Sequence, residues 1–283
     1  MGIKGGLDPR TFVFLRFVLA APVMLAVAAV AGRKVLPLFR SRAVWVVGLF
    51  NALGFLCQFL GQQYTDPSVA ALLVNLSVVL AAVGGAMFLK ERLGKLKVAG
   101  VILAVLGTFL ITTNGDFGVV AGSQALGDAY YLVAALSWAG YIVYAKKKTD
   151  EDNWDPIAVS AAIVTVTAVA VFPWYLSAGF GVVLSAASAG AIIYTAIFNT
   201  VIPFILYQAG LRHLSAGTSA VVLTLEIVVA VMISVVFLGQ QLSPLAWVGA
   251  VVILGSILLV SGVEVGGKTL SVSPTDGSRV KDG

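Results

Sequence analysis

Residues 216–242 read AGTSAVVLTLEIVVAVMISVVFLGQQL, and this stretch decides the fold. It is apolar and long enough to cross a bilayer, which takes about 20 residues at ~1.5 Å each. At that rise Glu226 lies roughly 15 Å into the stretch, near the middle of a membrane. A carboxylate there costs about 2.5–3.5 kcal/mol to insert, and such acids usually face a bundle interior or a watery pathway. The stretch therefore predicts a polar chamber inside an apolar protein.

The same pattern occurs earlier in the chain. Residues 67–93 read PSVAALLVNLSVVLAAVGGAMFLKERL, and a shift of 149 residues places Ser77 on Glu226. At this shift Ala71, Leu76, Ala81, Phe88, Leu89 and Leu93 fall on Ala220, Leu225, Ala230, Phe237, Leu238 and Leu242. A fixed-offset echo indicates two structural copies, and two copies around an intramembrane acid are typical of secondary transporters.

The composition indicates a polytopic membrane protein. Of the 283 residues 59% are hydrophobic and 11% are charged. The apolar runs do not alternate with period two, which argues against a membrane barrel. We predict an all-α bundle of two inverted repeats, at residues 1–114 and 127–263, followed by a disordered cytoplasmic tail at 264–283. The predicted spans are 11–31, 43–64, 67–89, 98–113, 127–145, 156–177, 186–211, 216–238 and 244–263.

Positive charges in the loops predict the orientation. They occur in every second connection and at the C-terminus, and the connections between have none. The rich groups are Arg33, Lys34, Arg40 and Arg42; Lys90, Arg92, Lys95 and Lys97; Lys146, Lys147 and Lys148; Arg212; and Lys268, Arg279 and Lys281. The positive-inside rule places these groups and the C-terminus in the cytoplasm, so we expect a multi-pass protein of the inner membrane. Topology explains the net charge of +5, and we expect no nucleic-acid partner.

The loops also show that the copies are inverted. The connection KERLGKLK is predicted to be cytoplasmic, and its uncharged echo GQQLSPLA is predicted to be outside. One helix lacks a counterpart, because the second copy opens with the span 127–145 and nothing before Leu7 matches it. An intact pair would have ten spans. We favour a truncated or mis-started chain, and the alternative is a protein that lacks this helix.

Two ionisable residues within spans are candidate site residues. Glu226 is either a structural acid hydrogen-bonded between helices or a site for a substrate amine or a proton, and we favour the second role. Arg16 lies about five residues into the first span, where it either snorkels toward the interface or binds an anionic group.

Amides and aromatic residues on span faces complete the predicted substrate site. Asn51 and Gln58 are seven residues apart and share a helical face, as do Ser68 and Asn75. For each amide the competing role is a hydrogen bond that joins helices. The candidates in the fifth and seventh spans are Trp138, Tyr141, Asn199 and Tyr207, for which core packing is the competing role.

Prolines inside spans are candidate hinges. Pro22, Pro173 and Pro203 each free a backbone carbonyl and permit a kink, which is either mobile or static.

Enzymatic chemistry has little support in the sequence. His213 is the only histidine, Cys57 is the only cysteine, and no nucleotide-binding motif occurs. We therefore predict no catalytic residues, no metal and no cofactor, and expect a proton or ion gradient, or facilitated movement, to drive transport.

Several segments resemble a known family. LDPRTFVFLRF at 7–17, FLKERLGKLKVAGVILAVLGTFLI at 88–111, GDAYYLVAALSWAGYIVYAKK at 127–147 and the helix pair at 225–260 are similar to the EamA-like branch of the drug/metabolite transporter superfamily. Ile227 and Gln240 stand where that family commonly has Pro and Glu. The resemblance implies a carrier of amino acids, aromatic ones included, or of drugs and other metabolites, usually outward.

These observations together predict a secondary transporter that moves a small metabolite across the inner membrane by alternating access, with export as the favoured direction. The alternatives are a membrane-embedded enzyme and a structural or receptor protein that transports nothing.

Overall fold

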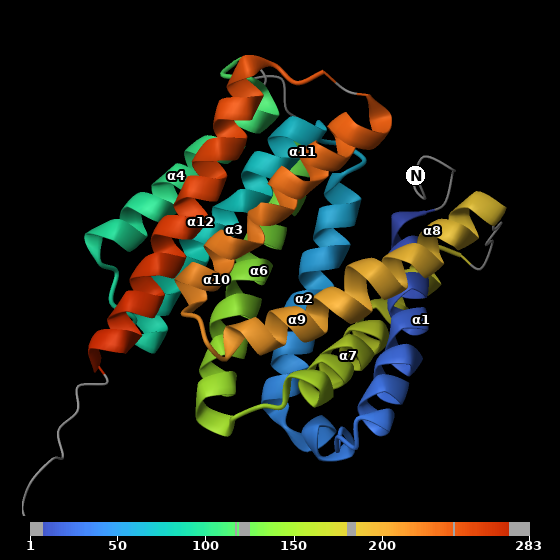
Figure 1. Ribbon diagram of the computed structural model, residues 1–283. Coiled ribbons are helices and arrows are strands. Elements are labelled where there is room, and N and C mark those ends of the chain that lie inside the picture. Colours follow the sequence, from blue (N-terminus) through green and yellow to red (C-terminus); the bar gives the residue numbers. More distant parts are fainter. Residues whose placement is uncertain (1–7, 117, 119–124, 180–184, 240, 272–283) are drawn as a thin grey trace, which may run out of the picture.

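The computed structural model describes residues 8–116, 118, 125–179, 185–239 and 241–271, and these fold as a bundle of helices (Figure 1). In this described part, nine helical segments are long and apolar enough to cross a membrane, as predicted. The elements are α1 (Pro9–Val30), η1 (Leu36–Arg40), α2 (Arg42–Gly61), α3 (Pro67–Leu89), α4 (Lys95–Thr113), α6 (Ala125–Asp152), α7 (Pro156–Ser177), α8 (Ala186–Ala196), η2 (Ile197–Val201), α9 (Ile202–Leu211), α10 (Ala216–Leu223), α11 (Leu225–Leu238) and α12 (Pro244–Ser271).

Helices α1 and α7 begin in the same way. Each has an Asp at the N-cap and a Pro in its first turn, where the missing N–H needs no partner. The Asp8 carboxylate accepts a hydrogen bond from the Arg10 N–H at 2.8 Å, and Asp155 accepts one from the Ala158 N–H at 3.0 Å. The Arg10 side chain also hydrogen-bonds Asp8 and holds the pKa of that carboxyl below its usual value.

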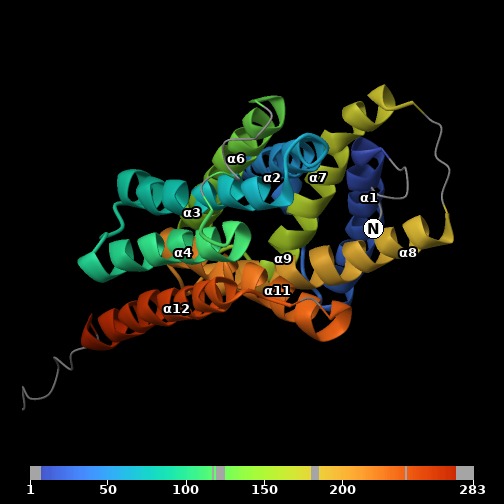
Figure 2. The ribbon, with the colours of Figure 1, turned by 90° about the horizontal axis from the view of Figure 1, so that it is seen from above.

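The helices are arranged as packed pairs. α4 lies along α12 on one side of the molecule and α1 along α7 on the other, with α2, α3 and α6 between them (Figures 1 and 2). Glycines let α4 and α12 approach closely, because a Cβ at Gly107 would lie 2.8 Å from the Gly249 carbonyl oxygen. Between α2 and α7, a Cβ at Gly48 would overlap the side chain of Val166. Small residues therefore set the helix spacing, as expected where lipid removes the hydrophobic drive for helix association.

Two spans are interrupted. The seventh contains the π-helical segment η2 between α8 and α9, and Pro203 follows it at the start of α9. The eighth breaks at Thr224 between α10 and α11, where the Thr224 hydroxyl donates to the Val221 carbonyl at 2.6 Å. This break forms without a proline. Position 227, where the EamA-like family that the sequence resembles commonly has Pro, is Ile227 here. The other candidate hinges, Pro22 and Pro173, lie inside α1 and α7.

Two predicted boundaries differ from the structure. α12 continues to Ser271, so helix covers the first part of the segment 264–283 that was expected to be disordered, and residues 272–283 lie outside the described part. α6 extends to Asp152, past the predicted end at 145. Ion pairs within this helix support the extension, including Lys148 with Glu151 at 2.6 Å.

The N-cap of α7 gives the first prediction. Asp155→Ala removes the side-chain acceptor at the helix start and should lower the free energy of unfolding by about 1 kcal/mol. The loss of stability is measured as a shift in the midpoint of denaturant unfolding in detergent. Ser41→Ala is the matched control, because Ser41 occupies the N-cap of α2 without a side-chain cap hydrogen bond and should tolerate the change. Equal losses in both variants would contradict this account of the cap.

Candidate functional site

An aromatic cluster occupies the centre of the bundle. Phe55 of α2 lies 5.0 Å from Phe17 of α1 and 4.7 Å from Trp138 of α6, measured between ring centroids. Tyr141, one turn along α6, lies 6.0 Å from Trp138 and 5.8 Å from Tyr207 of α9. Three of the predicted binding residues thus meet in one cluster, to which four helices contribute.

Arg16 enters this cluster from α1. Its side chain is buried, with the residue 6% exposed, so the snorkelling alternative is wrong. The guanidinium lies over the Phe55 ring at 4.7 Å and over the Phe17 ring at 5.6 Å. Its Nε donates to the Thr200 hydroxyl and its Nη2 to the Asn199 carbonyl, both at 2.7 Å. The π-helical segment η2 supplies both acceptors.

The positive charge of Arg16 has no carboxylate within ion-pair distance among the described residues. Glu226 interacts with it electrostatically from farther away. Both hydrogen-bond acceptors of the guanidinium are neutral oxygens. A buried guanidinium has five N–H donors and favours planar anions, so this arrangement is suited to receive a carboxylate or a similar group.

Glu226 lies in the first turn of α11, two residues beyond the break at Thr224. The residue is exposed in the described structure, and no hydrogen bond joins it to a neighbouring helix among the contacts found there. The described structure therefore gives no support to the alternative of a structural acid hydrogen-bonded between helices.

Amide side chains divide between two roles. The Gln58 carbonyl oxygen accepts from the Trp138 indole N–H at 3.1 Å, which places it at the aromatic cluster. Asn51 donates to Thr167 of α7 at 2.8 Å, and Asn75 donates to Thr108 of α4. Both are buried. For these two the competing role has the better support, since each joins a pair of helices.

Gln208 belongs to the cluster, although it was not among the predicted site residues. Its amide donates to the Tyr141 hydroxyl at 3.0 Å, and the residue is 1% exposed. The signal was an amide inside an apolar run, next to Tyr207. The buried Gln208 carbonyl oxygen and Tyr207 hydroxyl have no hydrogen-bond partner among the described residues, so both atoms could bind a polar group at the cluster.

Asn199 contributes differently from the prediction. It was predicted as a substrate-binding residue, with core packing as the competing role; the residue is exposed, and its backbone carbonyl accepts a hydrogen bond from Arg16. Sequence could not show this, because the carbonyl is positioned by the π-helical turn.

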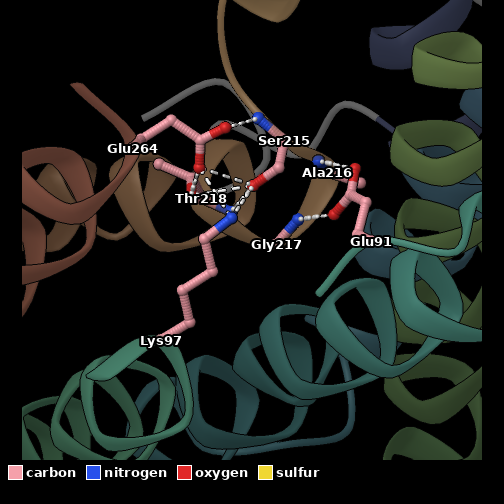
Figure 3. A network of polar contacts seen from close by, with 7 residues as sticks. All are labelled: Glu91, Lys97, Ser215, Ala216, Gly217, Thr218 and Glu264. Atoms are coloured by element: carbon pink, nitrogen blue, oxygen red, sulfur yellow. Dashed lines mark hydrogen bonds and ion pairs between the residues drawn. The ribbon is translucent and has the colours of Figure 1, made fainter. Parts of the chain in front are cut away.

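A polar network fastens one end of the bundle (Figure 3). Lys97, in the first turn of α4, forms an ion pair with Glu264 of α12 at 2.7 Å. The Glu264 carboxylate also accepts from the Ser215 N–H at 3.1 Å, the Ser215 hydroxyl at 3.0 Å and the Thr218 hydroxyl at 2.8 Å. The loop charge of Lys97 was interpreted only as a topology signal, and the contact depends on helices far apart in sequence.

Glu91 extends the network to the start of α10. One carboxylate oxygen accepts from the Ala216 N–H at 2.7 Å and the other from the Gly217 N–H at 3.5 Å. A carboxylate is favoured at this helix end, where N–H groups lack intrahelical partners.

A separate groove of about 590 Å³ lies between α3, α4 and α12. Its lining is leucine, valine and phenylalanine, Leu76 and Leu106 among them, and none of the predicted binding residues takes part. Such an apolar lining is suited to lipid chains rather than to a polar solute.

Comparison with known proteins gives the family. The model of the EamA-like transporter family matches residues 2–113 and again residues 125–262. The chain belongs to the EamA-like transporter family. It is therefore a multi-pass membrane transporter that handles small-molecule substrates, as the resemblance implied.

Relatives of this EamA-like transporter extend across most of the chain. Uncharacterized transporter YyaM of Bacillus subtilis is 27% identical over 266 residues, which cover 92% of this chain and 86% of the relative. An uncharacterized transporter of Archaeoglobus fulgidus is 25% identical over 273 residues, covering 93% and 91% of the two chains. A solved crystal structure shares the fold with a TM-score of 0.76 at 20% identity, covering 92% of this chain and 90% of the other.

The Asn75–Thr108 contact gives the second prediction. Thr108→Val leaves the buried Asn75 amide without its partner and should lower the free energy of unfolding by about 1 kcal/mol. The measurement is the unfolding midpoint in detergent. Thr112→Val is the matched control, since the Thr112 hydroxyl bonds only the backbone of its own helix. An unchanged midpoint for Thr108→Val would show that this contact contributes nothing.

Proposed function

We propose that this EamA-like transporter is a secondary carrier for a small amphipathic or aromatic solute with an anionic group, an amino acid being the simplest case. The observation that carries the proposal is the buried Arg16 guanidinium, which has neutral acceptors and aromatic neighbours. A solute carboxylate would compensate this charge. Phe55 and Trp138 would pack against its apolar part.

The substrate site would combine the aromatic cluster with two charges. Arg16 would bind the carboxylate of the solute. Tyr141 and Gln208 would lie beside its apolar part. Glu226 would pair with an ammonium group or carry a coupling proton. The backbone supports this, because η2 in the seventh span holds Arg16 and the break in the eighth span carries Glu226. Asn51 and Asn75 would support the helices around the site rather than contact the solute.

Alternating access would move the solute. The two matches to the family model, in the two halves of the chain, support a mechanism in which inverted copies exchange conformations. Pro22, Pro173 and Pro203 would act as hinges, and η2 and the Thr224 break supply irregular backbone beside the site. The proposed direction is export, driven by a proton or ion gradient. The protein would lie in the inner membrane with its C-terminus in the cytoplasm.

Arg16→Gln tests the anion site. Uptake or counterflow of a panel of amino acids in proteoliposomes should show KM raised at least about tenfold, since a charge-assisted hydrogen bond contributes about 1.5–3 kcal/mol. The matching decarboxylated amines should be unaffected. Arg16→Lys should restore little, because an ammonium lacks the planar fork. Arg10→Gln is the matched control, as Arg10 lies in the first turn of the same helix and pairs with Asp8. Equal effects on carboxylates and amines would overturn the proposal.

Glu226→Gln tests the role of the acid. We expect flux to fall strongly or to lose its dependence on a pH gradient, because an amide can neither carry a charge nor release a proton. The measurement is solute flux in proteoliposomes with and without an imposed gradient. Glu151→Gln, an exposed acid at the end of α6, is the control. Normal flux with unchanged pH dependence in Glu226→Gln would refute this role.

A further inference from the structure

Among the described residues, ion pairs join the two halves of the chain only at the end that carries the positively charged connections: Arg33 with Asp155 at 3.5 Å and Lys97 with Glu264 at 2.7 Å. Lys97 belongs to the N-terminal half, α1 to α4, and its partner Glu264 belongs to the C-terminal half, α6 to α12. Glu91 likewise reaches from the N-terminal half to the first N–H groups of α10. Figure 3 shows both connections converging on the residues that start α10. The network therefore couples α4, α10 and α12 across the boundary between the halves.

The ion pair is shielded from solvent. The side chains of Lys97 and Glu264 are 15% and 12% exposed. Each oxygen of the Glu264 carboxylate accepts at least one hydrogen bond, and Lys97 also donates to the Ser215 hydroxyl at 3.1 Å. Removing one partner of such a pair leaves a partly buried charge uncompensated, so the cost exceeds that of an exposed pair.

The backbone is closely packed beside the network. A Cβ at Gly217 of α10 would lie 3.3 Å from the Ala82 Cα of α3. A Cβ at Gly85 would lie 3.3 Å from the Ala216 Cβ and 2.7 Å from the Glu91 carboxylate. This end of the α3–α10 contact leaves no room for a solute.

At the opposite end, the described contacts between the halves are hydrogen bonds rather than ion pairs. The Ser243 hydroxyl donates to the Asn114 side chain, the Thr65 hydroxyl donates to Asp128 at 3.3 Å, and Arg10 donates to the Ser177 hydroxyl at 3.2 Å. At the repeat offset of 149 residues, Lys97 corresponds to Ala246 and Glu264 to Gly115, so no ion pair can form there from equivalent positions. Of the described helices, those packed substantially on α11 are α12 and α10, with no comparable contact from α3. Phe237, near the end of α11, is 78% exposed. The ion pairs described between the halves thus lie at one end, and the other end has hydrogen bonds alone.

We propose that Lys97, Glu264 and Glu91 form a latch that holds one end of the transport pathway shut, and that this latch opens once in each transport cycle. The latched end carries the positively charged connections, which the loop charges place in the cytoplasm. The latch biases the exchange between the two conformations toward the one closed at this end. This inference rests on the proposed function, because it requires a pathway that opens to alternate sides.

Cysteine labelling tests the latch without any solute. Cys57→Ala removes the single cysteine, and Ser219→Cys then places a thiol of similar size at a buried position of α10, one turn beyond Ser215. A membrane-impermeant maleimide is added to the latched side in inside-out vesicles. We expect slow labelling in this background and at least about tenfold faster labelling when Lys97→Gln is added.

Matched variants separate the latch from general effects. Lys147→Gln removes the same charge from an exposed pair within α6 and should leave labelling slow. Exchanging the charges by combining Lys97→Glu with Glu264→Lys should return the rate toward that of the background. If Lys97→Gln aggregates in size-exclusion chromatography, Glu91→Gln and Ser215→Ala apply the same test with smaller changes.

The outcomes distinguish the two proposals. Labelling that stays slow in a folded Lys97→Gln or Glu91→Gln variant overturns the latch, even if amino-acid flux is normal. Labelling that rises equally in Lys147→Gln also overturns it, because the effect would then be one of charge alone. Absence of flux across the solute panel, with the labelling response intact, would overturn the proposed substrate class and leave the latch standing.

Discussion

The structure depends on how charge is accommodated in an apolar slab. A membrane interior gives little solvation, so a buried ion must meet an opposite charge, oriented dipoles or an aromatic face. Arg16 meets neutral oxygens and the face of Phe55. Lys97 instead meets a full negative charge on Glu264. Arg16 can still pair with an anion, because its present acceptors are neutral. The charge of Lys97 is already compensated by Glu264. Arg16 therefore suits a ligand, and Lys97 suits a structural contact.

Irregular backbone provides a hydrogen-bond acceptor for Arg16 that a regular α-helix would not leave free. Carbonyls inside an α-helix are engaged along the helix, and few are available to a side chain. The π-helical segment η2 presents the Asn199 carbonyl and the Thr200 hydroxyl to Arg16 in the centre of the bundle. The break at Thr224 places Glu226 at a helix start. The two interruptions lie in consecutive spans; one holds Arg16 and the other carries Glu226.

Aromatic residues give the centre its shape. Trp138 meets Phe55 and Tyr141 edge-on, and Tyr141 stacks on Tyr207. Trp138 and Tyr141 are hydrogen-bonded to amides, and two buried polar atoms there have no partner in the part of the chain that the structure describes. Such a surface offers apolar area together with a few directed hydrogen bonds, the usual character of a small-molecule site.

The sequence alone determined the fold class and the number of spans, because each span is encoded locally by some 20 apolar residues between charged or turn-forming connections. It also indicated Arg16, Trp138 and Tyr141, since charged and polar groups at depth are rare enough to stand out. Only the tertiary structure decided which of the amides join helices, that Asn199 acts through its carbonyl, and that Gln208 belongs to the centre. The contact of Lys97 with Glu264 was beyond the sequence for the same reason: partners far apart in the chain are set by the packing of whole helices, which no local pattern records.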